Sequence, residues 1–250
     1  MSFNKVVHYI MSFRRCWREF GYGCAMRSFA SSEFLQFWPT FRKASFLPNN
    51  PIIIDIGANV GSFARACQLR WERAEILCCE PIPEIYELLK IRFKTCPSIH
   101  CFNIGISNYK GRAVLKQSKD SAFSSFLSFD DQYLDFGSGR DVIPEIDVEC
   151  KTLAELINEY VKKPIDLIKV DVQGNELNVI STLRDSDYPV RAIQLELSFY
   201  HVYKGQPLID EVVSVMEPLG YNLVEIYSPL KNNRGVVIHV EGFFRLHSDK

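Results

Sequence analysis

From residue 51 onward, short runs of β-branched and other apolar residues alternate with stretches whose apolar positions recur every three to four residues. The first pattern is typical of buried strands and the second of helices. The expected strands are Ile52–Ile56, Glu75–Cys79, Ile99–Ile104, Ile165–Val172, Val190–Leu197, Tyr221–Tyr227 and Gly235–Phe244. The expected helices are Gly61–Trp71, Pro83–Phe93, one that starts at the capping-box sequence Thr152–Glu155 and ends before Pro164, Glu176–Leu183 and Leu208–Leu219. Residues 107–147 show a less regular pattern, with turn residues at 136–139.

The alternation of strands and helices predicts an α/β fold with a doubly wound, mostly parallel sheet of seven strands. Only residues 228–234 connect the last two strands, which is too short for a helical crossover, so these strands should form an antiparallel hairpin. In such sheets ligands bind beyond the carboxyl ends of the strands. We therefore expect the chemistry in the loops that follow the strands.

The first 20 residues carry an apolar stripe at helical spacing, made of Phe3, Val6, Val7, Ile10, Phe13, Trp17 and Phe20. Two interpretations stay open. The stripe could dock on the main domain or on a second subunit, or it could form a basic interfacial helix on an anionic membrane. We expect residues 1–45 to be a basic helical appendage and residues 46–250 to form the main domain.

Composition is that of an ordinary globular protein, with 250 residues, 47% hydrophobic and 24% charged. No apolar run approaches the roughly 20 residues that cross a bilayer, so no transmembrane segment is expected. The formal net charge of −1 divides into +5 on residues 1–45 and −6 on the remainder. An acidic main domain argues against nucleic acid as a partner. A homo-oligomer stays open.

Eight cysteines occur without any CxxC pair or regular spacing. Neither a zinc site nor a disulfide framework fits this distribution. The N-terminal residues also lack the apolar core of a signal peptide. We therefore expect eight reduced cysteines in a cytoplasmic protein.

The loop after the first strand, Asp55-Ile56-Gly57-Ala58-Asn59-Val60-Gly61-Ser62-Phe63, is the most informative segment. Glycines there permit tight turning and close approach of a ligand, and the following helix offers unpaired N–H groups. A dinucleotide fingerprint would place glycine at 59 and glycine or alanine at 62, where this chain has Asn59 and Ser62. The remaining Asp-x-Gly-x-x-x-Gly pattern resembles that of S-adenosylmethionine binders, in which the acidic residue faces the amino acid part of the cofactor.

The next two strand ends supply further candidates for binding a nucleoside. Glu80 and Pro81 follow the second strand, where a carboxylate can accept hydrogen bonds from ribose hydroxyls. Asn103, Gly105 and Ile106 follow or end the third, where a polar side chain or backbone could meet an adenine edge. With the residues of the first loop, these are the expected cofactor contacts.

Polar residues near the end of the fourth long strand form the candidate catalytic group. Lys169, Asp171 and Gln173 alternate with apolar residues, so period-two geometry puts them on one face. We interpret Asp171 as a base or metal ligand and Lys169 as its charge partner or a substrate contact; the alternative is a structural ion pair. Glu196 ends the next strand, and His201 lies in the loop that follows, where it could serve as a base.

The ordered set of motifs resembles the FkbM-type methyltransferase family. It comprises residues 55–63, Glu80-Pro81-Ile82-Pro83, Ile106-Ser107-Asn108-Tyr109-Lys110-Gly111, Thr152-Leu153, residues 165–176 and Gln194-Leu195-Glu196, and the likeness covers about residues 50–245. Many members have glutamate where this chain has Gln173. Because a neutral amide is a poorer metal ligand, a metal at this position is in doubt, and a divalent metal is left open without support.

The resemblance implies a Rossmann-like class I methyltransferase fold and S-adenosylmethionine as cofactor. It also implies O-methylation of a sugar or carbohydrate-like hydroxyl, on a small molecule or a glycan, in polysaccharide or natural-product biosynthesis. Two other functions are weighed against it: an NAD(P)-dependent oxidoreductase, and a catalytically inactive module that binds S-adenosylmethionine.

Overall fold

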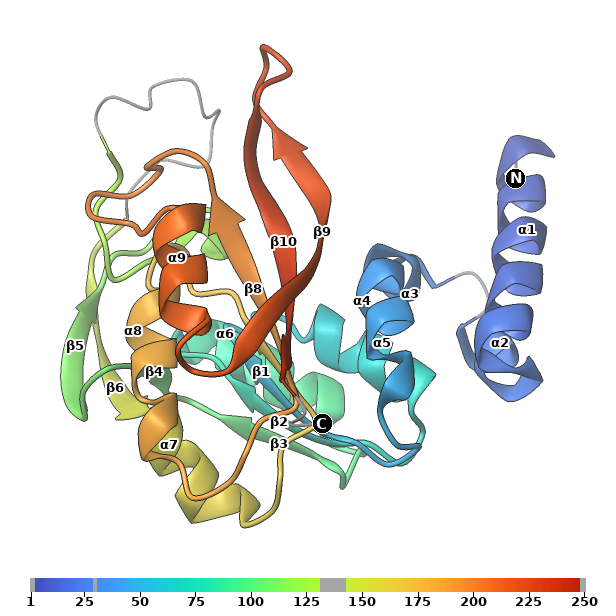
Figure 1. Ribbon diagram of the computed structural model, residues 1–250, viewed down its shortest axis with the longest axis horizontal. Coiled ribbons are helices and arrows are strands. Elements are labelled where there is room, and N and C mark those ends of the chain that lie inside the picture. Colours follow the sequence, from blue (N-terminus) through green and yellow to red (C-terminus); the bar gives the residue numbers. More distant parts are fainter. Residues whose placement is uncertain (1–2, 29–30, 131–142, 248–250) are drawn as a thin grey trace.

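The computed structural model describes residues 3–28, 31–130 and 143–247 (Figure 1). Its centre is a seven-stranded sheet of order β3-β2-β1-β7-β8-β10-β9. The strands are β1 (Ile52–Ile56), β2 (Glu75–Cys79), β3 (Ile99–Phe102), β7 (Leu167–Val170), β8 (Ala192–Ser198), β9 (Tyr221–Lys231) and β10 (Val237–Leu246). Neighbours from β3 to β8 are parallel, and β10 is antiparallel to both β8 and β9. All seven predicted strands and the antiparallel hairpin are therefore confirmed.

Alternate residues of the central strands pack into two hydrophobic cores, one on each face of the sheet. Ile53 and Leu167 pack into one core and Ile54 and Ile168 into the other, as the period of two requires. The first core includes residues of α5 (Ser62–Arg70) and α6 (Pro83–Phe93). The second includes residues of α7 (Leu153–Leu156), α8 (Glu176–Ser181) and α9 (Ile209–Met216). This arrangement is the doubly wound architecture expected for strands alternating with helices.

A second, three-stranded sheet occupies part of the region where the sequence shows no regular pattern. It has the order β4-β6-β5, with β4 (Gly105–Ser107), β5 (Gly111–Leu115) and β6 (Ile146–Thr152). The expected third strand, Ile99–Ile104, ends at Phe102 in the structure, and the chain moves into this smaller sheet at Gly105. The turn expected at 136–139 lies outside the described residues.

The predicted capping box is present at the start of α7. The amide of Glu155 donates to the Thr152 hydroxyl (3.1 Å), and the Thr152 amide donates to the Glu155 carboxylate (3.0 Å). The α-helix is shorter than expected, because residues 157–161 continue as a π-helical turn. Lys162, at φ +54°, ends the segment before Pro164. All eight cysteines are free, in agreement with the expectation from their spacing.

The described residues before the first strand form the α-helices α1 (Phe3–Phe20), α2 (Tyr22–Ser28), α3 (Ser32–Gln36) and α4 (Trp38–Lys43), followed by a short 3₁₀ helix, Ala44–Phe46. Figure 1 shows α1 at the outer edge of the molecule, with α3 and α4 beside α5. The side chains of most of the apolar stripe on α1 lie outside the described residues. Among the described residues, no helix is long and apolar enough to cross a membrane.

Helices α3 and α4 bury aromatic side chains in the same core as α5 and β1. Phe41 is fully buried, and its ring meets those of Phe34 (5.1 Å between centroids) and Trp71 (5.4 Å). Phe37 packs edge-on against Phe63, the second residue of α5 (5.0 Å). Aromatic pairs at these distances add to the stabilisation that burial of their area provides. Residues 32–43 are therefore held on the sheet by apolar packing.

This packing predicts that Phe41→Ala destabilises the whole protein. Removing a fully buried aromatic ring should lower the free energy of unfolding by about 3–5 kcal/mol, because the transfer energy is lost and a cavity remains. Equilibrium urea denaturation measures the change. Leu88→Ala, at an exposed position of α6, is the control and should change it by less than about 0.5 kcal/mol. A loss below about 1 kcal/mol for Phe41→Ala would show that α4 is not part of the cooperative core.

Candidate active site

A cavity of about 500 Å³ lies at the carboxyl ends of the parallel strands. The loops after β1, β2 and β7 contribute to its wall, together with β4 and residues 120–124. Gln36 and Phe37 contribute from the N-terminal helices, and His239 and Glu241 from β10. Small-molecule sites commonly have volumes of about 300–1,000 Å³, and open α/β sheets bind ligands at this edge. The position predicted from the strand pattern is thus the position of the cavity.

The loop after β1 is shaped by backbone conformations that favour glycine. Gly57 and Gly61 have φ of +75° and +80°, and between them Asn59 has φ +49°. A Cβ on Gly57 would lie 1.9 Å from the backbone oxygen of Asp171, so this position cannot hold a side chain. Gly61 packs instead against Phe93 and Leu89 and lies outside the cavity wall. The other predicted cofactor residues of this loop that line the cavity are Ala58, Asn59, Ser62 and Phe63.

Glu80 presents a buried carboxylate to the cavity. Its side chain is 4% exposed, and its two oxygens accept the amides of Asn59 (2.9 Å) and Ile82 (3.0 Å). Burial raises the pKa of Glu80 to about 7, although the two amides oppose the shift. Each oxygen keeps a further lone pair, so the group can also accept hydroxyl donors from a ligand. This fits the predicted role of Glu80 in holding a ribose.

Of the predicted adenine contacts, two line the cavity and one supports a neighbouring loop. Gly105 and Ile106 line the cavity, as do Pro81 and Ile104. Asn103 does not; its amide donates to the backbone oxygens of Glu80 (2.9 Å) and Pro81 (3.0 Å). Asn103 therefore braces the loop that carries Glu80. The cavity, the glycine loop and the Glu80 carboxylate fit a nucleoside cofactor such as S-adenosylmethionine.

Lys169 forms a buried ion-pair cluster with the carboxylates of Asp55 and Asp171. Its ammonium lies 3.1 Å from Asp171 Oδ2 and 3.8 Å from Asp55 Oδ1. Asp55 is fully buried and lies outside the cavity wall, and burial raises its pKa to about 6. The structure thus places Asp55 beside Lys169 within the sheet. Lys169 and Asp171 themselves line the cavity.

Both oxygens of Asp171 are engaged by this chain. Lys169 donates to Oδ2, and the Gln173 amide donates to Oδ1 at 2.7 Å. Burial by itself would raise the pKa of Asp171, but the ammonium and the amide outweigh it and hold that pKa below its usual value. Asp171 is therefore an ionised hydrogen-bond acceptor.

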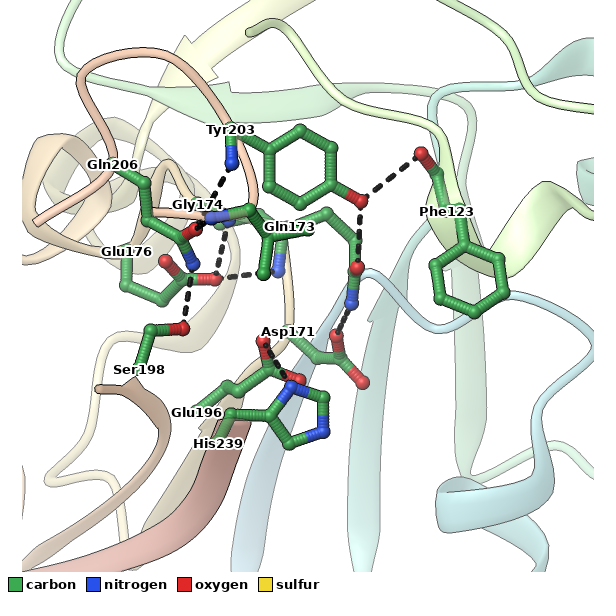
Figure 2. Close-up of polar contacts among 12 residues, drawn as sticks. Phe123, Asp171, Gln173, Gly174, Glu176, Glu196, Ser198, Tyr203, Gln206 and His239 are labelled. Atoms are coloured by element: carbon green, nitrogen blue, oxygen red, sulfur yellow. Dashed lines mark hydrogen bonds and ion pairs between the residues drawn. The ribbon is translucent and has the colours of Figure 1, made fainter. Parts of the chain in front are cut away.

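A histidine that the sequence analysis did not single out lies beside Asp171. His239 Nδ1 is 3.3 Å from Glu196 Oε1, and Figure 2 shows the ring between the Glu196 and Asp171 side chains. Burial lowers the pKa of His239, against the opposing effect of Asp171. Burial, reinforced by Asp171 and other carboxylates, raises the pKa of Glu196 well above its usual value. Both shifts favour the neutral form of the group concerned.

The loop after β7 is fixed by a network of buried polar groups, drawn in Figure 2. The Tyr203 hydroxyl donates to Gln173 Oε1 (2.9 Å) and is also 3.2 Å from the Phe123 oxygen. Glu176 Oε1 accepts the amides of Val172 (3.3 Å) and Gly174 (3.1 Å). Gln173 itself has φ +55°, an uncommon conformation that these contacts maintain. The network thereby aims the Gln173 amide at Asp171.

His201 lies away from these groups. It is exposed, its Nδ1 is 2.8 Å from the backbone oxygen of Gln206, and it is not part of the cavity wall. Of the predicted catalytic residues, the structure brings Asp171, Lys169 and Glu196 together and leaves His201 outside. His239 and Glu241 had one signal in the sequence, namely polar residues at alternate positions of an otherwise apolar strand. Within the described ranges, no group of three or more His, Cys, Asp or Glu side chains could hold a metal ion.

Comparison with known proteins agrees with the resemblance seen in the sequence. The model of the methyltransferase FkbM domain matches residues 55–223. Methyltransferase sdnD of Sordaria araneosa is 26% identical over 201 residues, which are 71% of this chain and 76% of that protein. The 2-O-methyltransferase NoeI of Sinorhizobium fredii is 30% identical over 164 residues, 63% and 67% of the two chains. The crystal structure of precorrin-6y C5,15-methyltransferase from Geobacter metallireducens aligns with 12% identity and a TM-score of 0.49, over 85% and 88% of the two chains.

The environment of Glu80 predicts that cofactor affinity depends on pH. Ribose hydroxyls donate to the ionised carboxylate, so binding favours that form. With a pKa of about 7 in the free protein, affinity for S-adenosylhomocysteine should rise between pH 6 and 8 and level off above. Glu80→Gln should remove most of this dependence and weaken binding by about 10- to 100-fold, the usual effect of losing hydrogen bonds to a charged group.

Isothermal titration calorimetry across this pH range measures both effects. Glu84→Gln, at an exposed position on α6, is the matched control and should bind as the wild type does. Equal affinity of Glu80→Gln and wild type at pH 8 would remove Glu80 from the cofactor site.

Proposed function

This chain belongs to the FkbM family of methyltransferases, and we propose that it is an O-methyltransferase for a carbohydrate-like hydroxyl. Its methyl donor is S-adenosylmethionine, which supplies a methyl group already activated on a sulfonium. The chain's own residues must then align the acceptor and receive its proton. Alignment of reacting groups supplies much of the rate enhancement in such a displacement.

The observation that carries the proposal is His239, which lines the cavity with Asp171 and is paired with Glu196. A hydroxyl group loses its proton as its oxygen attacks the methyl carbon, so it needs a proton acceptor at the site. His239 is held neutral by burial, and Glu196 engages Nδ1. We assign the ring proton to Nδ1, which donates it to Glu196 Oε1, so that the other ring nitrogen, Nε2, receives the proton from the hydroxyl.

Asp171 has a second role, which is electrostatic. Its lowered pKa makes it a weak base, but its ionised carboxylate near His239 stabilises the imidazolium that forms when the ring takes the hydroxyl proton. Lys169 keeps Asp171 ionised and in place. The oxygen–methyl bond forms as the sulfur–methyl bond breaks, and the hydroxyl proton goes to His239.

Several features support a sugar-like acceptor. Phe37, Phe123 and Phe126 line the cavity, and aromatic faces pack on the apolar faces of sugar rings. Asp171 and Glu241 offer carboxyl groups to neighbouring hydroxyls. One relative, NoeI, is named as a 2-O-methyltransferase.

The two other functions weighed from the sequence are less favoured. Family membership and the side chains at positions 59 and 62 argue against an NAD(P)-dependent oxidoreductase. An inactive binding module would have no need of a histidine at the cavity wall that is paired with a carboxyl group. An assay of methyl transfer distinguishes the inactive binding module from the enzyme.

The base assignment predicts that His239→Asn lowers kcat by about 10²–10⁴-fold, the usual contribution of a general base, while affinity for S-adenosylhomocysteine is unchanged. In the wild type, kcat should fall only when the pH drops below the lowered pKa of His239, where the ring becomes protonated. His239→Asn should lose this acid limb. Transfer of radiolabelled methyl, followed from pH 5 to 8, gives both results.

His201→Asn is the matched control, since His201 is an exposed histidine outside the cavity wall. It should keep kcat within about twofold, as expected for a surface change. If His201→Asn abolished transfer and His239→Asn did not, the roles of the two histidines would be reversed.

The acceptor class is tested by offering labelled donor with panels of sugars, nucleotide sugars and oligosaccharides, and with amine and thiol compounds of similar size. We expect labelled products that carry a methyl ether on a sugar oxygen, identified by tandem mass spectrometry. Methylation confined to amines or thiols would refute O-methylation of a sugar.

A further inference from the structure

The junction of helices α3 and α4 contributes directly to the cavity, although it precedes the residues that match the family domain. The match begins at residue 55, whereas Gln36 and Phe37 line the cavity at the junction of the two helices. Phe37 also packs on Phe63, which lines the cavity from α5. The cavity wall beside the cofactor loop is therefore incomplete without Gln36 and Phe37.

A buried chain of hydrogen bonds runs from α4 to Glu241. The Thr40 hydroxyl donates to Gln194 Oε1 (2.9 Å), and Gln194 Nε2 donates to Glu241 Oε2 (2.8 Å). The Tyr227 hydroxyl lies 3.1 Å from Thr40 Oγ1, and since the Thr40 proton goes to Gln194, Tyr227 is the donor. Thr40 and Gln194 are each 1% exposed. Water therefore does not compete for these bonds.

In the structure, Gln194 Oε1 faces the Thr40 hydroxyl and Gln194 Nε2 faces Glu241 Oε2. In this orientation Thr40 donates to Gln194 and Gln194 donates to the Glu241 carboxyl, so each bond joins a donor to an acceptor. Glu241 thus accepts a hydrogen bond from Gln194 of β8. Its remaining lone pairs can accept hydrogen bonds from a ligand in the cavity that it lines.

We propose that Thr40 is a positioning residue for the acceptor site: through Gln194 it holds the Glu241 carboxyl at the cavity wall, where Glu241 binds a second hydroxyl of the acceptor. This inference rests on the proposed O-methylation and identifies the acceptor as a polyol in which one hydroxyl is methylated while another is bound. His239 meets the reacting hydroxyl and Glu241 meets the other, since the two residues lie two positions apart on β10 and both line the cavity. Helices α3 and α4 thereby help to determine the acceptor.

The test is Thr40→Val, which keeps the branched shape of the side chain and removes the hydroxyl. We expect the KM for the polyol acceptor to rise about tenfold or more, the effect of about one well-made hydrogen bond or more. Affinity for S-adenosylhomocysteine and kcat at saturating acceptor should stay within about twofold. Thr40→Ser, which keeps the hydroxyl, should restore most of the affinity for the acceptor. Ser45→Ala, an exposed hydroxyl just after α4, is the control and should leave all three quantities unchanged.

A double-mutant cycle gives the second measurement. Glu241→Gln should raise the acceptor KM, and adding Thr40→Val to it should cause little further rise, because both changes disable the same contact. Acceptors that lack the second hydroxyl should be insensitive to both substitutions. Fully additive effects, or a Thr40→Val protein that loses thermal stability and cofactor affinity with no change in acceptor KM, would overturn the proposal.

A readout that needs no acceptor separates this inference from the proposed function. In protein labelled with ¹³C at glutamate carboxyl carbons, Glu241→Gln assigns the Glu241 resonance. Thr40→Val should shift that resonance and its titration, whereas Ser45→Ala should not. If the wild type methylates no hydroxyl compound but the resonance moves, the proposed function fails and the positioning role stands. If the resonance does not move, the positioning role fails.

Discussion

The buried ammonium of Lys169, held between two carboxylates, is the interaction on which the site depends. A charge removed from water is costly unless it is paired, and losing one partner of a buried pair typically costs about 3–5 kcal/mol. The parallel pairing of β1 with β7 sets Asp55 directly opposite Lys169. Any slip of this register by one residue would turn one of them into the opposite core. The pair therefore fixes the strand alignment, and the alignment fixes where Asp171 emerges at the sheet edge.

The same alternation explains why one face of the sheet carries the chemistry. Ile53, Leu167 and Phe243 lie on the face covered by α5 and the N-terminal helices. Counting in steps of two from these residues leads to Asp55, Lys169 and Asp171, and to Glu241 and His239. The opposite face, toward α7, α8 and α9, stays apolar along the same strands. Polar groups accumulate on one face near the carboxyl ends of the strands, and Thr40 of α4 donates a hydrogen bond to Gln194 there.

Patterns within a few residues of the sequence predicted much of this arrangement. Contacts between residues far apart in the sequence could not be predicted in the same way. The seven central strands and the Thr152 capping box depend on patterns within a few residues, so they could be read directly. The three-stranded sheet could not, because β5 and β6 pair across more than 30 residues and β5 is half exposed. His201 follows β8 in a loop and His239 lies on β10, and the contact of His239 with Glu196 depends on the pairing of β8 with β10, which no local pattern shows. The contribution of Thr40 depends on contacts with residues more than 150 positions away.

The close contact between Gly57 and Asp171 has a mechanical consequence. With no room even for a methyl group between the Gly57 α-carbon and the Asp171 carbonyl, the turn that follows β1 cannot move toward β7 without pushing the backbone that carries the Asp171 side chain. In the proposed function, this contact joins the donor side of the cavity to the acceptor side through the backbone. A displacement of the turn by an arriving donor would therefore shift Asp171 directly.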